Sequence, residues 1–234
     1  MTDTTNQIQS LYPFLYGEKK DPQQENVALL ESVNQKAQHS ITVKQDFFTQ
    51  NAQAIVNMAK DIAQIYQQHG KMFSMGNGGS SCDAAHFAVE FQHPVTAGRP
   101  ALPATNLVMD MAMFSAVAND LGTKHVYVRQ LEAHASVQDG LMGFSTSGNS
   151  ENLLAAYQKA KSMGMRTFGL AGGNGGEMKS SGFVDHCLVV NTDSIHRVQE
   201  VHVATYHILW DLVHTLLADQ RGKLYQANSE VSPA

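Results

Sequence analysis

Apolar residues change their spacing along this chain, and the change separates two kinds of structure. From about residue 26 to residue 68 they follow a helical, seven-residue spacing, with the stripe Ile41, Phe48, Ile55 and Ile62, extended by Met58 and Ile65. A narrow stripe of this kind is typical of helices that pack on each other or on a partner subunit. It therefore indicates homo-oligomerisation, although helices lying over the protein's own sheet would give the same pattern.

Beyond Gly70, short apolar runs alternate with amphipathic segments. The runs predict strands over residues 72–75, 104–108, 140–144, 166–170 and 184–190. The segments between and after them predict helices over residues 80–92, 111–119, 124–133, 151–163 and 195–220. Buried-type strands that alternate with helices form a parallel sheet covered on both faces, so the predicted fold class is α/β. Ligands of such sheets bind beyond the carboxyl ends of the strands.

The two ends of the chain are expected to lie outside this domain. Residues 1–25 are polar with isolated aromatic residues and are interpreted as an N-terminal arm, either for interaction or as an ordinary extension. Residues 222–234 are interpreted as a flexible tail, which leaves a single domain over residues 26–221, the N-terminal helices included. An apolar leader and a run of membrane-spanning length are both absent from the sequence, so we expect a cytoplasmic protein with no membrane partner.

Charge and cysteine content exclude two broad classes of protein. The sequence holds 16 Lys and Arg against 21 Asp and Glu, a formal net charge of −5 without a basic run, which argues against broad nucleic-acid binding. The two cysteines, Cys82 and Cys187, are too few for a disulfide framework and lack metal-type spacing. Both observations fit an ordinary soluble globular protein.

A glycine turn, Gly76–Gly79, follows the first predicted strand and precedes a helix. Ser80 and Asp83 have the spacing of a capping box, so the helix is expected to begin at Ser80. A strand, a glycine turn and a helix start together can hold an anion, because backbone N–H groups and the helix dipole point towards it. His86 and Glu90 lie four residues apart on one face of this helix. An anion site beside a possible acid–base or metal-binding pair indicates an enzyme that acts on a phosphorylated metabolite.

A second turn, rich in serine, lies at the end of the strand predicted over residues 140–144. Ser145, Thr146, Ser147 and Ser150 supply four hydroxyl groups where the next helix begins. Neutral donors at a helix N-terminus suit a phosphate monoester, and a plain turn with Ser150 as the N-cap is the alternative. Neither turn matches a Walker A or GxGxxG pattern, so a nucleotide cofactor is not indicated.

Three further segments carry residues whose role the spacing leaves open. Asn119 and Asp120 could bind sugar hydroxyls or cap the helix before them, and the run Gly172–Gly176 is interpreted as a loop. Gln199 and His207 are eight residues apart on the last helix, about 80° around its axis, and could line one cavity. A lone histidine in such a helix is more often structural.

Three motifs, Gly76–Ser80, Ser145–Ser150 and Arg197–His202, resemble the signatures of SIS (sugar isomerase) domain proteins. The segment Cys82–Glu90 resembles, more narrowly, the phosphoheptose isomerases, and the resemblance spans roughly residues 50–220. It implies a three-layer α/β/α sandwich of the flavodoxin-like kind with a five-stranded parallel sheet. It also implies a homotetramer with active sites between subunits.

The resemblance further implies the conversion of sedoheptulose 7-phosphate into D-glycero-D-manno-heptose 7-phosphate through an enediol, the first step of ADP-heptose synthesis for the lipopolysaccharide core. Glu90 would be the base and His207 the acid, and the serine turn would hold the 7-phosphate. The substrate-binding positions would be Asn77, Gly78, Gly79, Asn119, Asp120, Ser145, Thr146, Ser147, Ser150 and Gln199. The resemblance implies a divalent metal, usually zinc, held by His86, Glu90, Gln199 and His207.

Two departures from the family keep alternatives open. Gln92–Thr96 stands where the isomerase typically has an arginine-bearing segment, and His196 stands where an aspartate is frequent. An isomerase or sensor of a different sugar phosphate is therefore one alternative. Another is a non-catalytic SIS-domain regulator of the kind that binds the bacterial replication initiator. Such proteins lose the active-site carboxylate and histidine. The enzyme is favoured here by the presence of His86, Glu90, Gln199 and His207.

Overall fold

The computed structural model describes residues 22–96 and 98–218, which fall into two units divided between residues 41 and 42. The described part of the first unit, residues 22–41, is the beginning of helix α2 (Pro22–Gln67). Its large apolar side chains are exposed, among them Val27, Leu29, Leu30, Val33 and Ile41. Residues 22–25 of the predicted arm form the first turn of α2. The rest of the arm and the tail over residues 222–234 lie outside the described residues.

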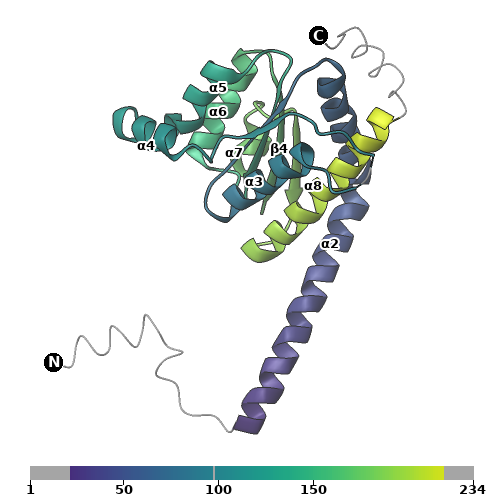
Figure 1. The fold of residues 1–234 in the computed structure, drawn as a ribbon. Helices are drawn as coiled ribbons and strands as arrows, with labels where there is room; N and C mark the ends of the chain where they lie inside the picture. Colours follow the sequence, from purple (N-terminus) through teal and green to yellow (C-terminus); the bar gives the residue numbers. More distant parts are fainter. Residues whose placement is uncertain (1–21, 97, 219–234) are drawn as a thin grey trace, which may run out of the picture. The chain divides into compact units, whose positions relative to one another are not determined.

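A parallel sheet forms the centre of the second unit (Figure 1). Its strands are β1 (Met72–Gly76), β2 (Ala104–Asn106), β3 (Gly140–Ser145), β4 (Arg166–Gly172) and β5 (His186–Val190). They pair in the order β2-β1-β3-β4-β5, and every pair is parallel. The predicted α/β fold with a five-stranded parallel sheet is confirmed. Strand order reverses between β1 and β3, so a ligand site is expected at the carboxyl ends of these two strands.

Helices cover both faces of the sheet, because successive side chains of each strand point to opposite sides. On β3, Met142 and Phe144 belong to a core that α2, α3 (Gly79–Gln92) and α8 (Ile195–Ala218) complete. Leu141 belongs to the opposite core. That core is completed by α4 (Met111–Asp120), α5 (Val126–His134), α6 (Glu151–Ser162) and α7 (Gly176–Ser180). Among the described residues, every helix is too short or too polar to be a membrane-spanning segment.

The second half of the apolar stripe in α2 packs on the protein's own sheet. Ile55, Met58, Ile62 and Ile65 are all buried in the core that contains Phe144. Phe48 is only partly buried, and Ile41 is 57% exposed. The alternative of helices over the protein's own sheet is therefore right for residues 55–65. Homo-oligomerisation through the stripe before them stays a prediction.

The predicted capping box at the start of α3 is wrong. Gly78 occupies the N-cap position with a φ of 54°, and no side chain caps the helix. Ser80 already lies within the helix, and Asp83 is buried with Oδ2 4.0 Å from His202 Nδ1 of α8. The carboxylate of Asp83 points into the helix contact, so it cannot return to the first turn. The short helix α7 was not predicted, because five residues are too few to show a helical period.

Gly76→Ala tests the close approach between β1 and α3. A methyl group at residue 76 would lie 2.2 Å from the backbone oxygen of Ser80, which cannot move without shifting α3. We expect the free energy of unfolding to fall by about 3 kcal/mol. At Gly182, with a φ of 75°, a methyl group meets nothing within 4 Å, so Gly182→Ala should cost only about 1 kcal/mol. Urea denaturation measures the free energy of unfolding of both variants, and an equal decrease in the two would contradict the expected clash.

Candidate active site

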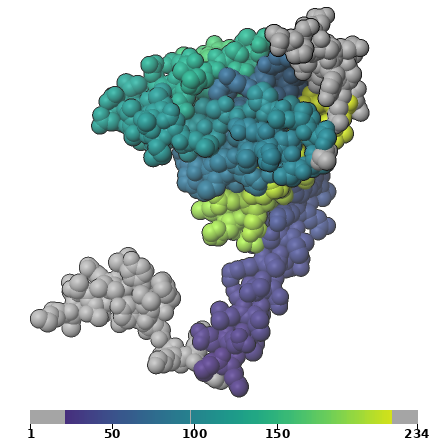
Figure 2. Space-filling model, viewed as in Figure 1, coloured from purple at the N-terminus to yellow at the C-terminus, as the bar shows by residue number. Residues whose placement is uncertain are grey.

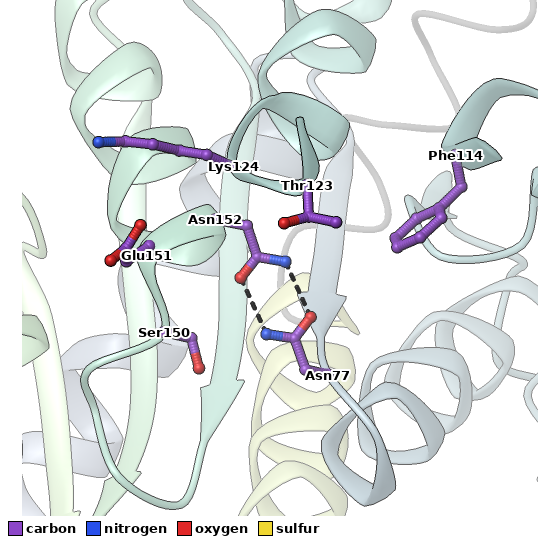
Figure 3. A pocket seen from close by; sticks show the side chains of 7 residues that line it. All are labelled: Asn77, Phe114, Thr123, Lys124, Ser150, Glu151 and Asn152. Carbon is purple, nitrogen blue, oxygen red and sulfur yellow. Dashed lines mark hydrogen bonds between the residues drawn. The ribbon is translucent and has the colours of Figure 1, made fainter. Parts of the chain in front are cut away.

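The turn between β1 and α3 is held by side chains from α5 and α6. Asn77 and Asn152 exchange two hydrogen bonds, with each amide nitrogen donating to the other's oxygen at 2.8 and 2.9 Å (Figure 3). The Tyr127 hydroxyl donates to the Gly76 carbonyl oxygen at 2.7 Å and lies 3.2 Å from Asn77 Oδ1. These bonds fix the orientation of Asn77, one of the predicted substrate ligands.

A pocket of about 410 Å³ opens beside this amide pair, where the strand order reverses. It is lined by Asn77, Phe114, Thr123, Lys124, Ser150, Glu151 and Asn152 (Figure 3). Two predicted substrate ligands therefore line the same cavity. Asn77 follows β1 and Ser150 follows β3, the two strands between which the strand order reverses. Lys124 brings a cation to this lining and Glu151 an anion. Lys124 was not predicted as a site residue, because a single lysine in a surface turn carries no distinguishing signal.

Hydroxyl groups of the serine turn, residues 145–150, form hydrogen bonds within the turn. Ser145 Oγ accepts a hydrogen bond from the Gly148 N–H at 3.1 Å and lies 3.3 Å from Ser150 Oγ. Ser147 Oγ accepts from the Asn149 N–H at 3.2 Å, and Thr146 is half-buried between the two serines. Ser150 occupies the N-cap position of α6, yet its side chain makes no capping hydrogen bond. The first N–H groups of a helix have no partner within it, so this end of α6 suits an anion.

The glycine run Gly172–Gly176 and helix α7, which begins at Gly176, both contact the serine turn. Met178 N–H donates to the Gly148 oxygen at 2.9 Å, and Glu177 N–H donates to Asn149 Oδ1 at 2.9 Å. A methyl group on Gly148, whose φ is 67°, would lie 2.1 Å from the Gly175 oxygen. The loop interpretation is confirmed for the residues between β4 and α7, and the loop has a structural task.

His86 and Glu90 on α3 face His207 on α8. His86 Nε2 lies 3.0 Å from Glu90 Oε1 and 3.5 Å from His207 Nε2. On the other side of the ring, His86 Nδ1 lies 2.7 Å from the Tyr206 hydroxyl. Trp210 Nε1 donates to the Glu90 backbone oxygen at 2.8 Å, which ties the two helices together. In Figure 2 the yellow-green surface of α8 adjoins the blue surface that contains α3.

The side chains of His86, Glu90 and His207 fit a divalent metal. Their donor atoms all lie within 4.8 Å of one another. Zinc binds imidazole nitrogen and carboxylate oxygen at about 2.0–2.2 Å, and tetrahedral geometry then separates neighbouring donors by roughly 3.3 Å. The separations of 3.0 and 3.5 Å lie on either side of that value.

Gln199, the fourth predicted ligand, lies against the glycine turn. A methyl group built on Gly79 would lie 2.3 Å from Gln199 Nε2, so the absence of a side chain at Gly79 leaves room for this amide. Gln199, in the second turn of α8, therefore lies beside the start of α3. Its role as a metal ligand or substrate ligand stays a prediction.

Asn119 and Asp120 lie at the exposed end of α4, where the Asn119 amide donates to Asp120 Oδ1 at 2.8 Å. They do not line the pocket described above, and their contact with a sugar stays a prediction. The departures from the family are also at the surface. His196 is exposed in the first turn of α8, and Gln92 donates from its side chain to the Ala104 oxygen.

Burial shifts the ionisation of two side chains between α3 and α8. Desolvation, and then the neighbouring His86, lower the pKa of His207, while Glu90 acts in the opposite direction. Neutral His207 is therefore favoured near neutral pH, and a neutral imidazole can bind a metal or donate its N–H. Burial raises the pKa of Asp83 to about 6, and the neighbouring His86 acts in the opposite direction.

Comparisons with known proteins agree on one family. The SIS domain family matches residues 37–172 of this chain. The phosphoheptose isomerase of Pelodictyon phaeoclathratiforme is 43% identical over 182 residues, which cover 76% of this chain and 85% of the relative. That of Helicobacter pylori (strain P12) is 43% identical over 152 residues, which cover 65% and 78%.

Two solved structures show the same likeness in three dimensions. A phosphoheptose isomerase from Francisella tularensis has a TM-score of 0.76 at 31% identity and covers 80% of this chain and 98% of its own. The one from Neisseria gonorrhoeae has a TM-score of 0.74 at 32% identity and covers 80% and 99%. Nearly the whole length of both relatives is therefore matched.

Asp83→Asn tests the effect of burying a carboxylate between α3 and α8. Its pKa of about 6 in the folded protein, against an ordinary value of 3.8, means that the folded protein binds the proton more tightly than the unfolded chain. The stabilising contribution of Asp83 is therefore full below about pH 4 and is lost as the pH rises through about 6.

Between about pH 4 and pH 8, we expect the stability of the variant relative to the wild type to increase by about 2 kcal/mol. Urea denaturation of both proteins across this range measures the difference. A difference that stays constant with pH would contradict the shifted ionisation.

Proposed function

Because the chain belongs to the SIS domain family and, within it, to the phosphoheptose isomerases, we propose that it converts sedoheptulose 7-phosphate into D-glycero-D-manno-heptose 7-phosphate. It is an enzyme, a ketose–aldose isomerase of phosphosugars. The reaction is the first step of ADP-heptose synthesis for the lipopolysaccharide core. The alternative of a non-catalytic regulator is set aside, since the relatives that cover most of the chain are named as isomerases.

The single observation that carries the proposal is that the site has two chemically different ends. The serine turn and the N-terminus of α6 suit an anion, and Lys124 adds a positive charge to the adjoining pocket. His86, Glu90 and His207 form a group suited to proton transfer. The substrate also has two ends, because its phosphate is on C7 and its reacting carbons are C1 and C2.

Helix α3 spans the distance between these ends. It begins at Gly79, beside the pocket, and His86 follows seven residues later, or roughly 10 Å along the axis. In the proposed complex the serine turn, Ser145 to Ser150, holds the phosphate. Asn77, Gly78 and Gly79 contact the sugar hydroxyls, with Gln199, Asn119 and Asp120 as further proposed contacts.

The proposed reaction moves hydrogen between C1 and C2. Glu90 removes a proton from C1, the electron pair forms the C1–C2 double bond, and the C2 carbonyl oxygen takes a proton from His207. In the second half of the reaction His207 takes back a proton from the C1 hydroxyl and Glu90 returns its proton to C2, which leaves an aldehyde at C1 and restores both side chains. The lowered pKa of His207 keeps its ring neutral, and a neutral imidazole can still donate its N–H to an oxygen that becomes negative.

A divalent ion, with zinc the proposed one, would be held by His86, Glu90 and His207, with Gln199 as the proposed fourth ligand. When bound, it would supply Lewis-acid stabilisation of negative charge on the substrate oxygens. The two imidazoles and one carboxylate are the donor types that zinc prefers, which supports the choice. A nucleotide cofactor has no part in the proposal.

We further propose that the active site is completed between subunits of a homotetramer in the cytoplasm. His207 is exposed, and the apolar side chains Val89 and Ile208 beside the metal-binding group are 48% and 39% exposed. A second subunit over this surface would bury these side chains and exclude water from the enediol. A charged sugar phosphate does not cross a bilayer unaided, so the enzyme would act in the compartment that makes it.

The reaction is tested directly with purified protein and sedoheptulose 7-phosphate, with and without a chelator. We expect an aldoheptose phosphate as product, and a rate that falls in chelator and returns on addition of zinc. The absence of product under both conditions at high enzyme concentration would contradict the proposal. Equal rates with and without chelator would contradict the metal requirement but not the proposed reaction.

Glu90→Gln tests the proposed base. The amide cannot accept the C1 proton, so we expect turnover to fall at least about 10³-fold, while calorimetry still detects substrate binding. The control is Glu132→Gln, which removes a surface carboxylate of α5 that pairs with Arg129 and Lys159. Turnover of the control should be unchanged, and substantial turnover by Glu90→Gln would remove Glu90 as the base.

A further inference from the structure

Tyr206 is packed directly behind His86. Its side chain is 1% exposed, and its ring makes edge-to-face contacts with His86 and His207 at centroid distances of 5.2 and 5.0 Å. Phe144 of β3 packs on the same ring at 5.8 Å. The hydroxyl is thereby held 2.7 Å from His86 Nδ1 by packing from the sheet and from both helices.

The position of this hydroxyl bears on which nitrogen of His86 carries a proton. An imidazole binds a metal through a nitrogen without a proton, and a neutral ring then carries its proton on the other nitrogen. Nε2 is the nitrogen that faces Glu90 and His207, so metal binding there requires the proton on Nδ1. Nδ1 faces Tyr206, whose oxygen can accept a hydrogen bond from an N–H.

The other tautomer, with the proton on Nε2, could not bind a metal through that nitrogen. With its proton on Nε2, His86 would donate to Glu90 Oε1, 3.0 Å away, and would offer no lone pair between Glu90 and His207. A tyrosine hydroxyl that donates to Nδ1 would favour that arrangement. The direction of the Tyr206–His86 hydrogen bond therefore decides whether this tyrosine assists or opposes metal binding.

We infer that Tyr206 is a positioning residue for the metal ligand His86: its oxygen accepts the Nδ1–H and holds the tautomer and ring orientation in which Nε2 faces a divalent ion. The inference rests on the metal site of the proposed function. Metal-ligating histidines usually donate their second N–H in this way, and loss of the acceptor typically weakens metal binding about 10–100-fold. The substitution Tyr206→Phe would keep the packing of the ring and remove the acceptor of the Nδ1–H, which favours the tautomer with the proton on Nε2.

The test is the zinc affinity of metal-free, full-length protein, measured by competition with a chromophoric chelator. We expect Tyr206→Phe to weaken zinc binding about 10–100-fold. The matched control is Tyr157→Phe, which removes another buried hydroxyl, bonded to the Phe168 oxygen at 2.6 Å on the opposite face of the sheet. Zinc affinity of the control should equal that of the wild type. Unchanged or tighter zinc binding by Tyr206→Phe would overturn the inference.

A second measurement uses the wild type alone and does not depend on the folding of a variant. In nitrogen-15 spectra of the zinc-loaded protein, His86 should show a protonated Nδ1 and a metal-bound Nε2, and the reverse assignment would overturn the inference. Wild-type protein that binds no zinc would overturn the metal site together with this inference. Equal affinities of wild type and Tyr206→Phe would overturn only the role of Tyr206.

Discussion

The close contact between α3 and α8 is the constraint on which the site depends. His86 and His207 are 121 residues apart in the chain, and they meet only because both helices lie on the same face of the sheet. Small buried side chains, Ala84 and Ala88, belong to the α3 side of this core. The Trp210 indole and the Tyr206 hydroxyl then join the helices by hydrogen bonds at Glu90 and His86. Loss of this contact would separate the groups proposed for proton transfer without altering any of them.

Most of the fold could be predicted from the sequence, because its strands and helices have local patterns. Buried runs such as residues 72–75 and 140–144 have strand length, and the amphipathic segments between them have a helical period. The start of α3 was mispredicted because Ser80 and Asp83 have capping-box spacing, whereas the positive φ of Gly78 turns the chain into the helix earlier. The apolar stripe of α2 stayed ambiguous, because residue spacing does not tell a helix's own sheet from a partner subunit.

The candidate site could be predicted only in part. His86 and Glu90 were identified together because they are four residues apart on one helix, and the serine turn because it follows a strand. The proximity of His207 to this pair came from the family resemblance, since it depends on how α8 packs. Asn152 and Tyr206 were missed, because an asparagine in a first helical turn and a tyrosine on a buried helix face have no distinguishing signal. Their partners, Asn77 and His86, lie 75 and 120 residues away.

The reciprocal amide pair of Asn77 and Asn152 has a consequence for how the site receives a charged molecule. Both side chains are neutral at every pH at which the protein is folded, and their bond is between dipoles. An ion pair in this place would be weakened by salt, and one of its members would be drawn towards an arriving dianion. An amide pair carries no net charge, so an arriving dianion does not pull one member away from the other. The Asn77–Asn152 pair can therefore keep its geometry whether or not a phosphate occupies the proposed site at the serine turn.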